Sequence, residues 1–200
     1  MSGNTSTDRG RTGSPRLIGR PRLTAAQRFA AAGIGAAVLV LVGWHFGWSP
    51  QLPAYLFFAW MGVWLTAVDL RHRLLPNRIV LTSLAGGAVL LAVAAAAGTE
   101  WSSLARAAAG SVALFVLYLL LALVNPAGMG MGDVKLAAVV GLFLAYQGWQ
   151  LLAVGTFAGF LLGALGSLAM LAMRRGGLKS TIPFGPPMIA GALAAILLAG

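Results

Sequence analysis

The sequence predicts an all-α fold, a polytopic transmembrane helix bundle of about seven spans, with six as the lower count. Of the 200 residues, 59% are hydrophobic and only 9% are charged. The mean hydropathy is strongly positive, at +0.86. The apolar residues form long unbroken runs rather than the spaced pattern of a water-soluble amphipathic helix. The chain is therefore predicted to be an integral membrane protein.

The candidate spans follow from the length of helix that crosses a bilayer, which is about 20 residues. The fifth apolar run is the shortest, so we expect a tilted or partly re-entrant helix there, and non-helical backbone at that depth must be buried in protein or face water. Small residues recur, including the pair Gly159 and Gly163, and this spacing favours close helix packing. The spans fall at roughly 29–48, 52–70, 79–97, 104–124, 134–147, 150–173 and 182–199.

The first 28 residues differ in character from the rest, which divides the chain into a tail, 1–28, and a transmembrane domain, 29–200. The tail has six arginines against one aspartate and is rich in Gly, Ser, Thr and Pro, which predicts a disordered segment. It is too long and too polar for a secretory signal. No aromatic residue is interleaved with the arginines, so the expected partner is the anionic lipid head group and not nucleic acid.

The distribution of Lys and Arg between the loops predicts the orientation, because positively charged loops tend to stay in the cytoplasm. With seven alternating spans, one side of the membrane receives 13 of the 14 basic residues, and Arg106 is the exception. The other side receives Trp48, Trp101 and Trp149, which suit an interfacial aromatic belt. We therefore expect a multi-pass protein of the cytoplasmic membrane with a cytoplasmic amino terminus and an external carboxyl terminus.

Acidic residues are rare, and two of the four lie at the ends of spans. Asp8 belongs to the tail and Glu100 to an external loop, whereas Asp69 and Asp133 both fall at the cytoplasmic end of the predicted bundle. An ionisable residue at membrane depth is a functional candidate by default. Two structural roles remain open: an interfacial ion pair of Asp69 with the nearby arginines 71 and 73, and a helix cap for Asp133.

Two carboxyl groups that face each other have a defined chemistry, because like charges held close together cannot both ionise and the pair keeps one proton. One carboxyl then acts as base toward a water and the other as acid toward a peptide carbonyl, which is aspartyl proteolysis. Gly128, Gly130 and Gly132 would allow close approach of a substrate strand, although a flexible loop is an alternative. The chain has no cysteine and no HExxH pattern, so neither a metal nor a cofactor is predicted.

Three local patterns resemble the prepilin peptidases, or type IV leader peptidases, which are intramembrane aspartyl proteases of the GxGD kind. They are Asp69 followed by LRHRLLPN, the segment GMGMGDVKL that contains Asp133, and IPFGPP at 182–187. The resemblance implies that Asp69 and Asp133 are the catalytic pair, and that the protein removes the basic leader of a prepilin or pseudopilin precursor at the cytoplasmic face. It also implies that several matched positions shape the site: Pro76, Asn77, Gly130, Gly132, Lys135, Pro183, Gly185 and Pro186.

The sequence departs from longer family members, which carry a cytoplasmic cysteine cluster and also methylate the new amino terminus. Since cysteine is absent and no hydrophilic insert interrupts the spans, the chain resembles a short, peptidase-only form in which methyl transfer is not expected. Two other functions stay open: a small cation or proton-coupled transporter that uses the same two aspartates, and a structural subunit of a secretion machine. The transporter is disfavoured by the absence of evident inverted repeats and by the position of both acids at one face.

Overall fold

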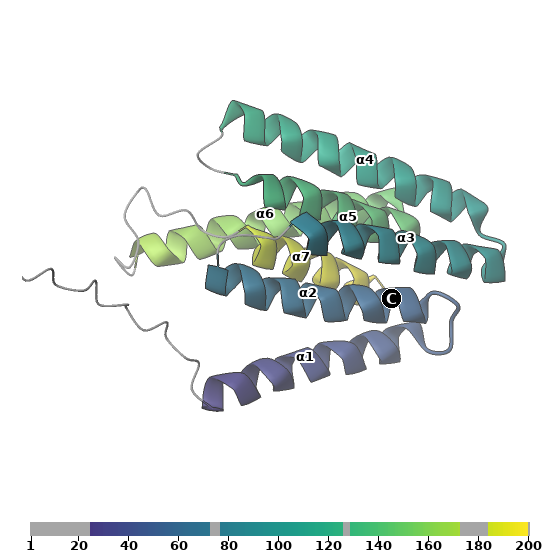
Figure 1. The fold of residues 1–200 in the computed structure, drawn as a ribbon, viewed down its shortest axis with the longest axis horizontal. Coiled ribbons are helices and arrows are strands. Elements are labelled where there is room, and N and C mark those ends of the chain that lie inside the picture. The colour runs from purple at the N-terminus through teal and green to yellow at the C-terminus, as the bar shows by residue number, and fades with distance from the viewer. Residues whose placement is uncertain (1–24, 73–76, 126–128, 173–183, 200) are drawn as a thin grey trace, which may run out of the picture.

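In the part of the chain that the structure describes, seven helices follow one another (Figure 1). The computed structural model describes residues 25–72, 77–125, 129–172 and 184–199, and within these ranges it contains no strand. One helix forms at each predicted span, so the predicted all-α bundle is confirmed. Most of the tail lies outside the described residues, and its disorder stays a prediction. The helices are α1 (Ala25–Phe46), α2 (Leu52–His72), α3 (Asn77–Gly98), α4 (Trp101–Val124), α5 (Met131–Gln147), α6 (Trp149–Ala172) and α7 (Gly185–Leu198).

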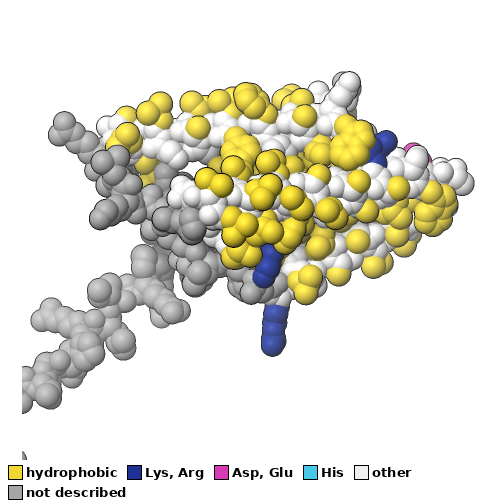
Figure 2. Space-filling view, turned by 90° about the horizontal axis from the view of Figure 1, so that it is seen from above, with side chains coloured by type: hydrophobic (Ala, Val, Ile, Leu, Met, Phe, Trp, Pro, Cys, Tyr) yellow, Lys and Arg dark blue, Asp and Glu magenta, His cyan; other side chains and the backbone are white. Residues whose placement is uncertain are grey.

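The outer surface of the bundle is that of a multi-pass membrane protein. In the described residues, four helices (α2, α3, α4 and α6) contain a stretch long and apolar enough to cross a membrane, and α1 and α7 contribute shorter apolar stretches. Hydrophobic side chains cover most of the face in Figure 2, where charged ones are few. Large apolar side chains exposed in this way indicate contact with lipid. They include Trp60, Val93, Leu123, Phe157 and Leu168.

Successive helices run in opposite directions, which sorts their ends into two groups (Figure 1). One end of the bundle is made by the N-termini of the odd-numbered helices and the C-termini of α2, α4 and α6. Asp69 lies in the last turn of α2 and Asp133 in the first turn of α5, so both belong to this end. We call it the carboxylate end. The predicted placement of the two acids at a common end of the bundle is therefore confirmed.

Helix α5 is the centre of the bundle, although its sequence is the weakest of the predicted spans. It is one continuous helix of 17 residues. From Val134 to Tyr146 every side-chain position except Lys135 is buried, and α5 packs against α3, α4, α6 and α7. A helix that is apolar all round can be enclosed on every side without burying a polar face. Because its neighbours enclose α5, it does not need the length or the lipid-facing surface of an outer span.

Two side-chain contacts fix α5 at the end opposite the carboxylate end. Arg106 of α4 donates from Nε to the carbonyl oxygen of Ala145, at 2.7 Å, and from Nη2 to that of Tyr146, at 2.6 Å. Tyr55 of α2 donates from its hydroxyl to the carbonyl oxygen of Phe143, at 2.8 Å. The last four carbonyls of a helix have no partner within the helix, so Arg106 satisfies two groups, those of Ala145 and Tyr146, that would otherwise be unpaired inside the bundle, while Tyr55 attaches α2 to the preceding turn. Arg106, the exception to the predicted charge asymmetry, thus caps α5.

Glycines allow the closest helix contacts. Where α4 crosses α5, a Cβ added to Gly141 would collide with the carbonyl oxygen of Gly110 and lie 3.1 Å from the Cα of Ser111. Where α6 meets α7, a Cβ on Gly191 would lie 2.7 Å from the Cα of Gly159. Small residues at such crossings let two backbones touch. The predicted packing role of Gly159 is therefore confirmed.

The contact between α4 and α5 makes a testable prediction about stability. Gly141→Ala should lower the free energy of unfolding by about 1–3 kcal/mol, because the added methyl has only backbone atoms to meet and the two helices must separate. Thermal unfolding of the purified protein in detergent measures the change. The matched control is Gly43→Ala, at which a Cβ meets nothing within 4 Å, so the control should be neutral or slightly stabilising. Equal melting temperatures for the two variants would contradict the assigned contact.

Candidate active site

Asp69 is buried in the last turn of α2. Its side chain is 4% exposed, and within the described residues its Oδ2 atom has no hydrogen-bond partner. A buried polar atom without a partner costs free energy and is uncommon in a folded protein. The alternative ion pair with Arg71 and Arg73 stays untested, because those two side chains lie outside the described set. Asp69 therefore presents a carboxyl oxygen inside the bundle that the described part of the chain does not use.

The start of α7 holds the Asp69 carboxyl in place. The backbone amide of Gly185, the first residue of α7, faces this carboxyl. Pro186 and Pro187 follow and have no N–H, so Gly185 supplies the available amide among the first three residues of the helix. A Cβ at Gly185 would lie 2.7 Å from Asp69 Oδ2 and 3.4 Å from Leu136 Cδ2. Glycine is thus required here for the close approach of α2 and α5 to α7.

Asp133 lies in the first turn of α5. It is half-buried and is the third residue of the helix, and its N–H donates to the carbonyl oxygen of Gly130 at 3.0 Å. The backbone of Gly130, which is exposed and extended at φ −80° and ψ 151°, in turn hydrogen-bonds the Asp133 carboxyl. This reciprocal arrangement is that of an N-terminal cap. The alternative of a helix cap for Asp133 therefore fits the geometry, and it is compatible with a chemical role.

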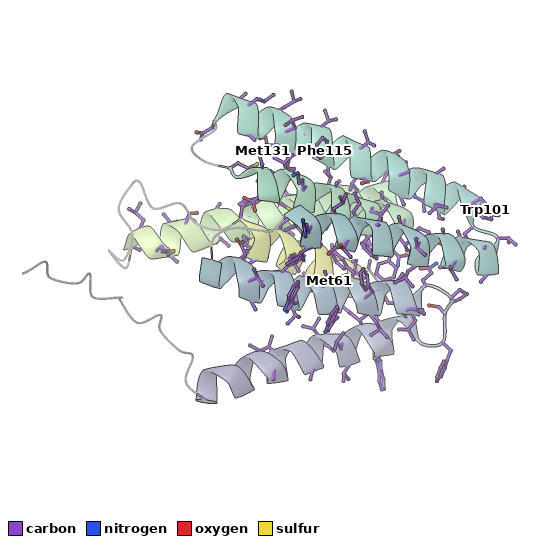
Figure 3. The ribbon with its side chains drawn as sticks, in the orientation of Figure 1. Met61, Trp101, Phe115 and Met131 are labelled. Carbon is purple, nitrogen blue, oxygen red and sulfur yellow. The ribbon has the colours of Figure 1, made fainter. Side chains whose placement is uncertain are left out.

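The two carboxyl groups are close enough to interact electrostatically, and they come from helices far apart in the sequence. Each lies at the N-terminus of a helix, Asp133 in α5 and Asp69 against α7, where the helix dipole stabilises negative charge. Mutual repulsion opposes ionisation of both at once. The arrangement can therefore hold one proton between two carboxyls, as general acid–base chemistry on a carbonyl group requires. In Figure 3, Met131 marks this end of α5, and Trp101 marks the opposite end of the bundle.

The other predicted site residues divide into those that the structure places and those that it does not. Gly130 and Gly185 lie against the two carboxyls, as described above. Gly132 and Lys135 are half-buried in α5 on either side of Asp133, and Pro186 is half-buried in the first turn of α7. Asn77 begins α3, but its side chain is not described. Gly128, Pro76 and Pro183 lie outside the described residues.

An aromatic cluster beside the acids is the part of the site that the sequence does not single out. The ring of Tyr118, in α4, stacks on Phe160 of α6 at a centroid distance of 5.3 Å. Phe184, the residue before Gly185, lies 6.1 Å from Tyr118 and 5.3 Å from Phe160. The Tyr118 hydroxyl is close enough to Asp133 to interact with it electrostatically. The only sequence signal is one hydroxyl in the apolar run FVLYLLL, which by itself indicates ordinary packing.

Comparison with known proteins gives a consistent result. Residues 56–168, which include both Asp69 and Asp133, match the type IV leader peptidase family. The prepilin leader peptidase/N-methyltransferase of Stutzerimonas stutzeri is 36% identical over 157 residues, covering 78% of this chain and 53% of the relative. The protein of that name from Pseudomonas aeruginosa is 36% identical over 155 residues, covering 76% and 52%. The one from Bacillus subtilis is 31% identical over 169 residues, covering 84% and 64%.

These relatives are longer than the chain, which spans about half the length of the first two. No solved structure matches it. The family match extends over more than half of the 200 residues and contains both acids at the carboxylate end. The predicted family resemblance is thereby confirmed, and the chain belongs to the type IV leader peptidase family.

Proposed function

We propose that this chain is an intramembrane aspartyl endopeptidase that removes the basic leader peptide from type IV prepilin-like precursors, with Asp69 and Asp133 as its catalytic pair. The observation that carries the proposal is the meeting of these two carboxyl groups at one end of an apolar bundle. The relatives named prepilin leader peptidase/N-methyltransferase supply the substrate class. Methyl transfer is not part of the proposal, because the chain has no cysteine with which to form the cluster of the longer members.

The reaction needs the pair to hold one proton. The ionised carboxylate takes a proton from a water as the water oxygen attacks the scissile carbonyl carbon, and the protonated carboxyl gives its proton to the carbonyl oxygen. The resulting tetrahedral intermediate, which carries two hydroxyls, collapses when the C–N bond breaks: the leaving nitrogen takes up the proton from the carboxyl that received one, and the other carboxylate takes a proton from one hydroxyl as the carbonyl re-forms. The products are the leader with a new carboxyl terminus and the mature protein with a free amino terminus. The pair ends with one proton, as it began.

Backbone geometry next to Asp133 supports access by an extended substrate. Gly130 is exposed, has no side chain, and holds an extended conformation directly before α5. A strand of substrate can approach the backbone closely at such a position. Peptide bonds are cleaved in an extended conformation because a helical one keeps the carbonyl hydrogen-bonded. The Gly130 edge of the carboxylate end is therefore the proposed place where the leader junction lies.

The carboxylate end is proposed to face the cytoplasm. Of the two ends, it receives 13 of the 14 basic residues by the alternation of the helices. The amino terminus then lies in the cytoplasm and the carboxyl terminus outside. The basic segment 1–28 is proposed to lie against anionic lipid on the same side, leaving 29–200 as the peptidase domain. Since the described cytoplasmic surface offers few acids to a basic leader, lipid head groups are the proposed counter-charge near the site.

Substitution of the two acids tests the proposed chemistry. Asp69→Asn and Asp133→Asn should each reduce leader cleavage by about 10³-fold or more, because an amide cannot exchange the proton that the pair must move, and the double variant should be scarcely worse than either single one. The measurement is cleavage of a precursor with a basic leader and a following apolar helix by protein purified in detergent or liposomes. Glu100→Gln is the matched control, since Glu100 is an exposed carboxylate at the opposite end.

Two outcomes would count against the pair as catalytic groups. Substantial processing by either asparagine variant would remove the assignment and leave the acids as a helix cap and an interfacial group. An ion flux in liposomes that depends on Asp69 and Asp133, in the absence of cleavage, would instead favour the transporter. Western blots of membrane fractions must show near-normal levels of each variant, so that loss of activity is not loss of protein.

The orientation can be tested at the two ends of a single helix. Ser102 and Asn125 are exposed at opposite ends of α4, and the native chain has no cysteine. In spheroplasts, a membrane-impermeant thiol reagent should label Ser102→Cys and should label Asn125→Cys only after permeabilisation, because Asn125 lies at the carboxylate end. Labelling of Asn125→Cys alone in intact spheroplasts would invert the proposed topology.

The contact at the start of α7 gives a further test. Gly185→Ala should reduce cleavage by about 10-fold or more, since its Cβ would displace the Asp69 carboxyl or the end of α7, and an error of about 1 Å in such geometry costs rate. Gly166→Ala on α6 is the control, because a Cβ there meets nothing within 4 Å. Initial rates at saturating substrate measure the effect. Full activity of Gly185→Ala would show that the position of Asp69 does not depend on this contact.

A further inference from the structure

Tyr118 carries a buried hydroxyl without a described partner. Its side chain is 0% exposed, and its Oη atom makes no hydrogen bond within the described residues. A phenylalanine would fill the same space and make the same ring contacts, whereas a buried hydroxyl that stays unpaired costs free energy. The packing of the core therefore does not explain why this residue is a tyrosine.

The register of α4 against α5 brings Tyr118 to the level of Asp133. The two helices are antiparallel and touch where Gly110 meets Gly141. Tyr118 is eight residues beyond Gly110, and Asp133 is eight residues before Gly141, so both lie about 12 Å from that contact toward the carboxylate end. Tyr118 also belongs to the buried face of α4. The electrostatic interaction between Tyr118 and Asp133 agrees with this register.

The ring of Tyr118 packs against two aromatic rings, one of which lies next to the part of the site that contains Asp69. Phe160 stacks on it with an interplanar angle of 25°, and Phe184 packs against both rings. Phe184 has little freedom, because its own ring lies so close to α6 that a Cβ at Gly163 would be 2.7 Å from it. Phe184 directly precedes Gly185, which holds Asp69. The ring contacts of Tyr118 thus link it to Phe184 and, through the chain, to Gly185 beside the Asp69 carboxyl.

We infer that Tyr118 is a positioning residue for the catalytic pair, and that its hydroxyl donates a hydrogen bond to the Asp133 carboxylate as the substrate binds. The inference rests on the proposed peptidase function. A donor behind one carboxyl fixes which of its oxygens faces the water and the peptide, and this orientation matters more in the transition state than in substrate binding. Gly130 supplies a backbone hydrogen bond on the other side of Asp133, so the carboxylate would be held from two directions.

The test is Tyr118→Phe, which keeps the ring and removes only the hydroxyl. The value of kcat for precursor cleavage should fall by about 10- to 100-fold, the size expected for loss of one hydrogen bond to a charged group, while KM stays within about twofold. A leader-junction peptide with a hydroxyethylene group in place of the scissile bond mimics the tetrahedral intermediate. Its inhibition constant should rise by a factor similar to the loss in kcat.

The matched control is Tyr146→Phe. Tyr146 is also buried, and its hydroxyl too has no partner among the described residues, but it lies thirteen residues along α5 from Asp133, about 20 Å away at the opposite end. Its variant should cleave the precursor like the native protein. An equal loss of activity in both variants would mean that any buried hydroxyl matters, and it would overturn the inference.

The inhibition constant separates positioning from folding. A partly misfolded preparation lowers the apparent kcat but leaves KM and the inhibition constant unchanged, because both are properties of the folded fraction. A fall in kcat without a rise in the inhibition constant would therefore overturn the inference, as would native cleavage by Tyr118→Phe. Failure of the proposed function gives a different pattern, in which Asp133→Asn itself still cleaves. An inactive Asp133→Asn together with a fully active Tyr118→Phe would remove the role of Tyr118 alone.

Discussion

Burying two carboxyl groups inside an apolar helix bundle costs free energy unless other groups stabilise their charge. The rest of this structure depends on that stabilisation. The N-termini of α5 and α7 contribute to stabilising this charge. Asp133 lies in the first turn of α5 and receives a backbone hydrogen bond from Gly130, and Asp69 faces the first amide of α7 at Gly185. Helix N-termini favour negative charge but do not bind a proton. Stabilisation by helix N-termini is therefore compatible with the proposed role of the pair, in which the two carboxyls share and exchange one proton.

How closely the two acids approach depends on the register of the helices, and the contacts that fix this register lie far from the acids. Arg106 binds the last carbonyls of α5, and the Gly110–Gly141 contact lets α4 and α5 touch. With α5 held at those points, a rigid helix carries Asp133 to a fixed height, about 12 Å beyond the glycine contact. The α6–α7 contact at Gly159 and Gly191 fixes α7 in the same way. Contacts far from the two acids thus help to set the distance between the carboxyls.

Hydropathy and the scarcity of acids were enough to predict the helices, their alternation, and the common end of Asp69 and Asp133, because span length and loop charge are local properties. The resemblance implied only that Gly185 shapes the site. Its close approach to Asp69 was not predicted, since it is a contact between helices that lie more than one hundred residues apart. Arg106 looked like an ordinary loop residue, and Tyr118 like ordinary core. Their partners, the α5 carbonyls and Asp133, are defined by the register of α4 on α5, which no single-helix pattern contains.

Buried polar atoms in the site lower the stability of the fold, and the packing of α5 must compensate for this loss. Asp69 Oδ2 and Tyr118 Oη are both buried without described partners, and each such atom costs about 1–3 kcal/mol. An apolar pair of the same shape would fold more tightly. In the proposed reaction, a water, a peptide carbonyl or a rotated carboxylate supplies each of these atoms with a hydrogen-bond partner. Interactions that strengthen toward the transition state are those that raise kcat. The packing of the enclosed, glycine-lined α5 stabilises the bundle enough for it to hold such polar atoms and remain folded.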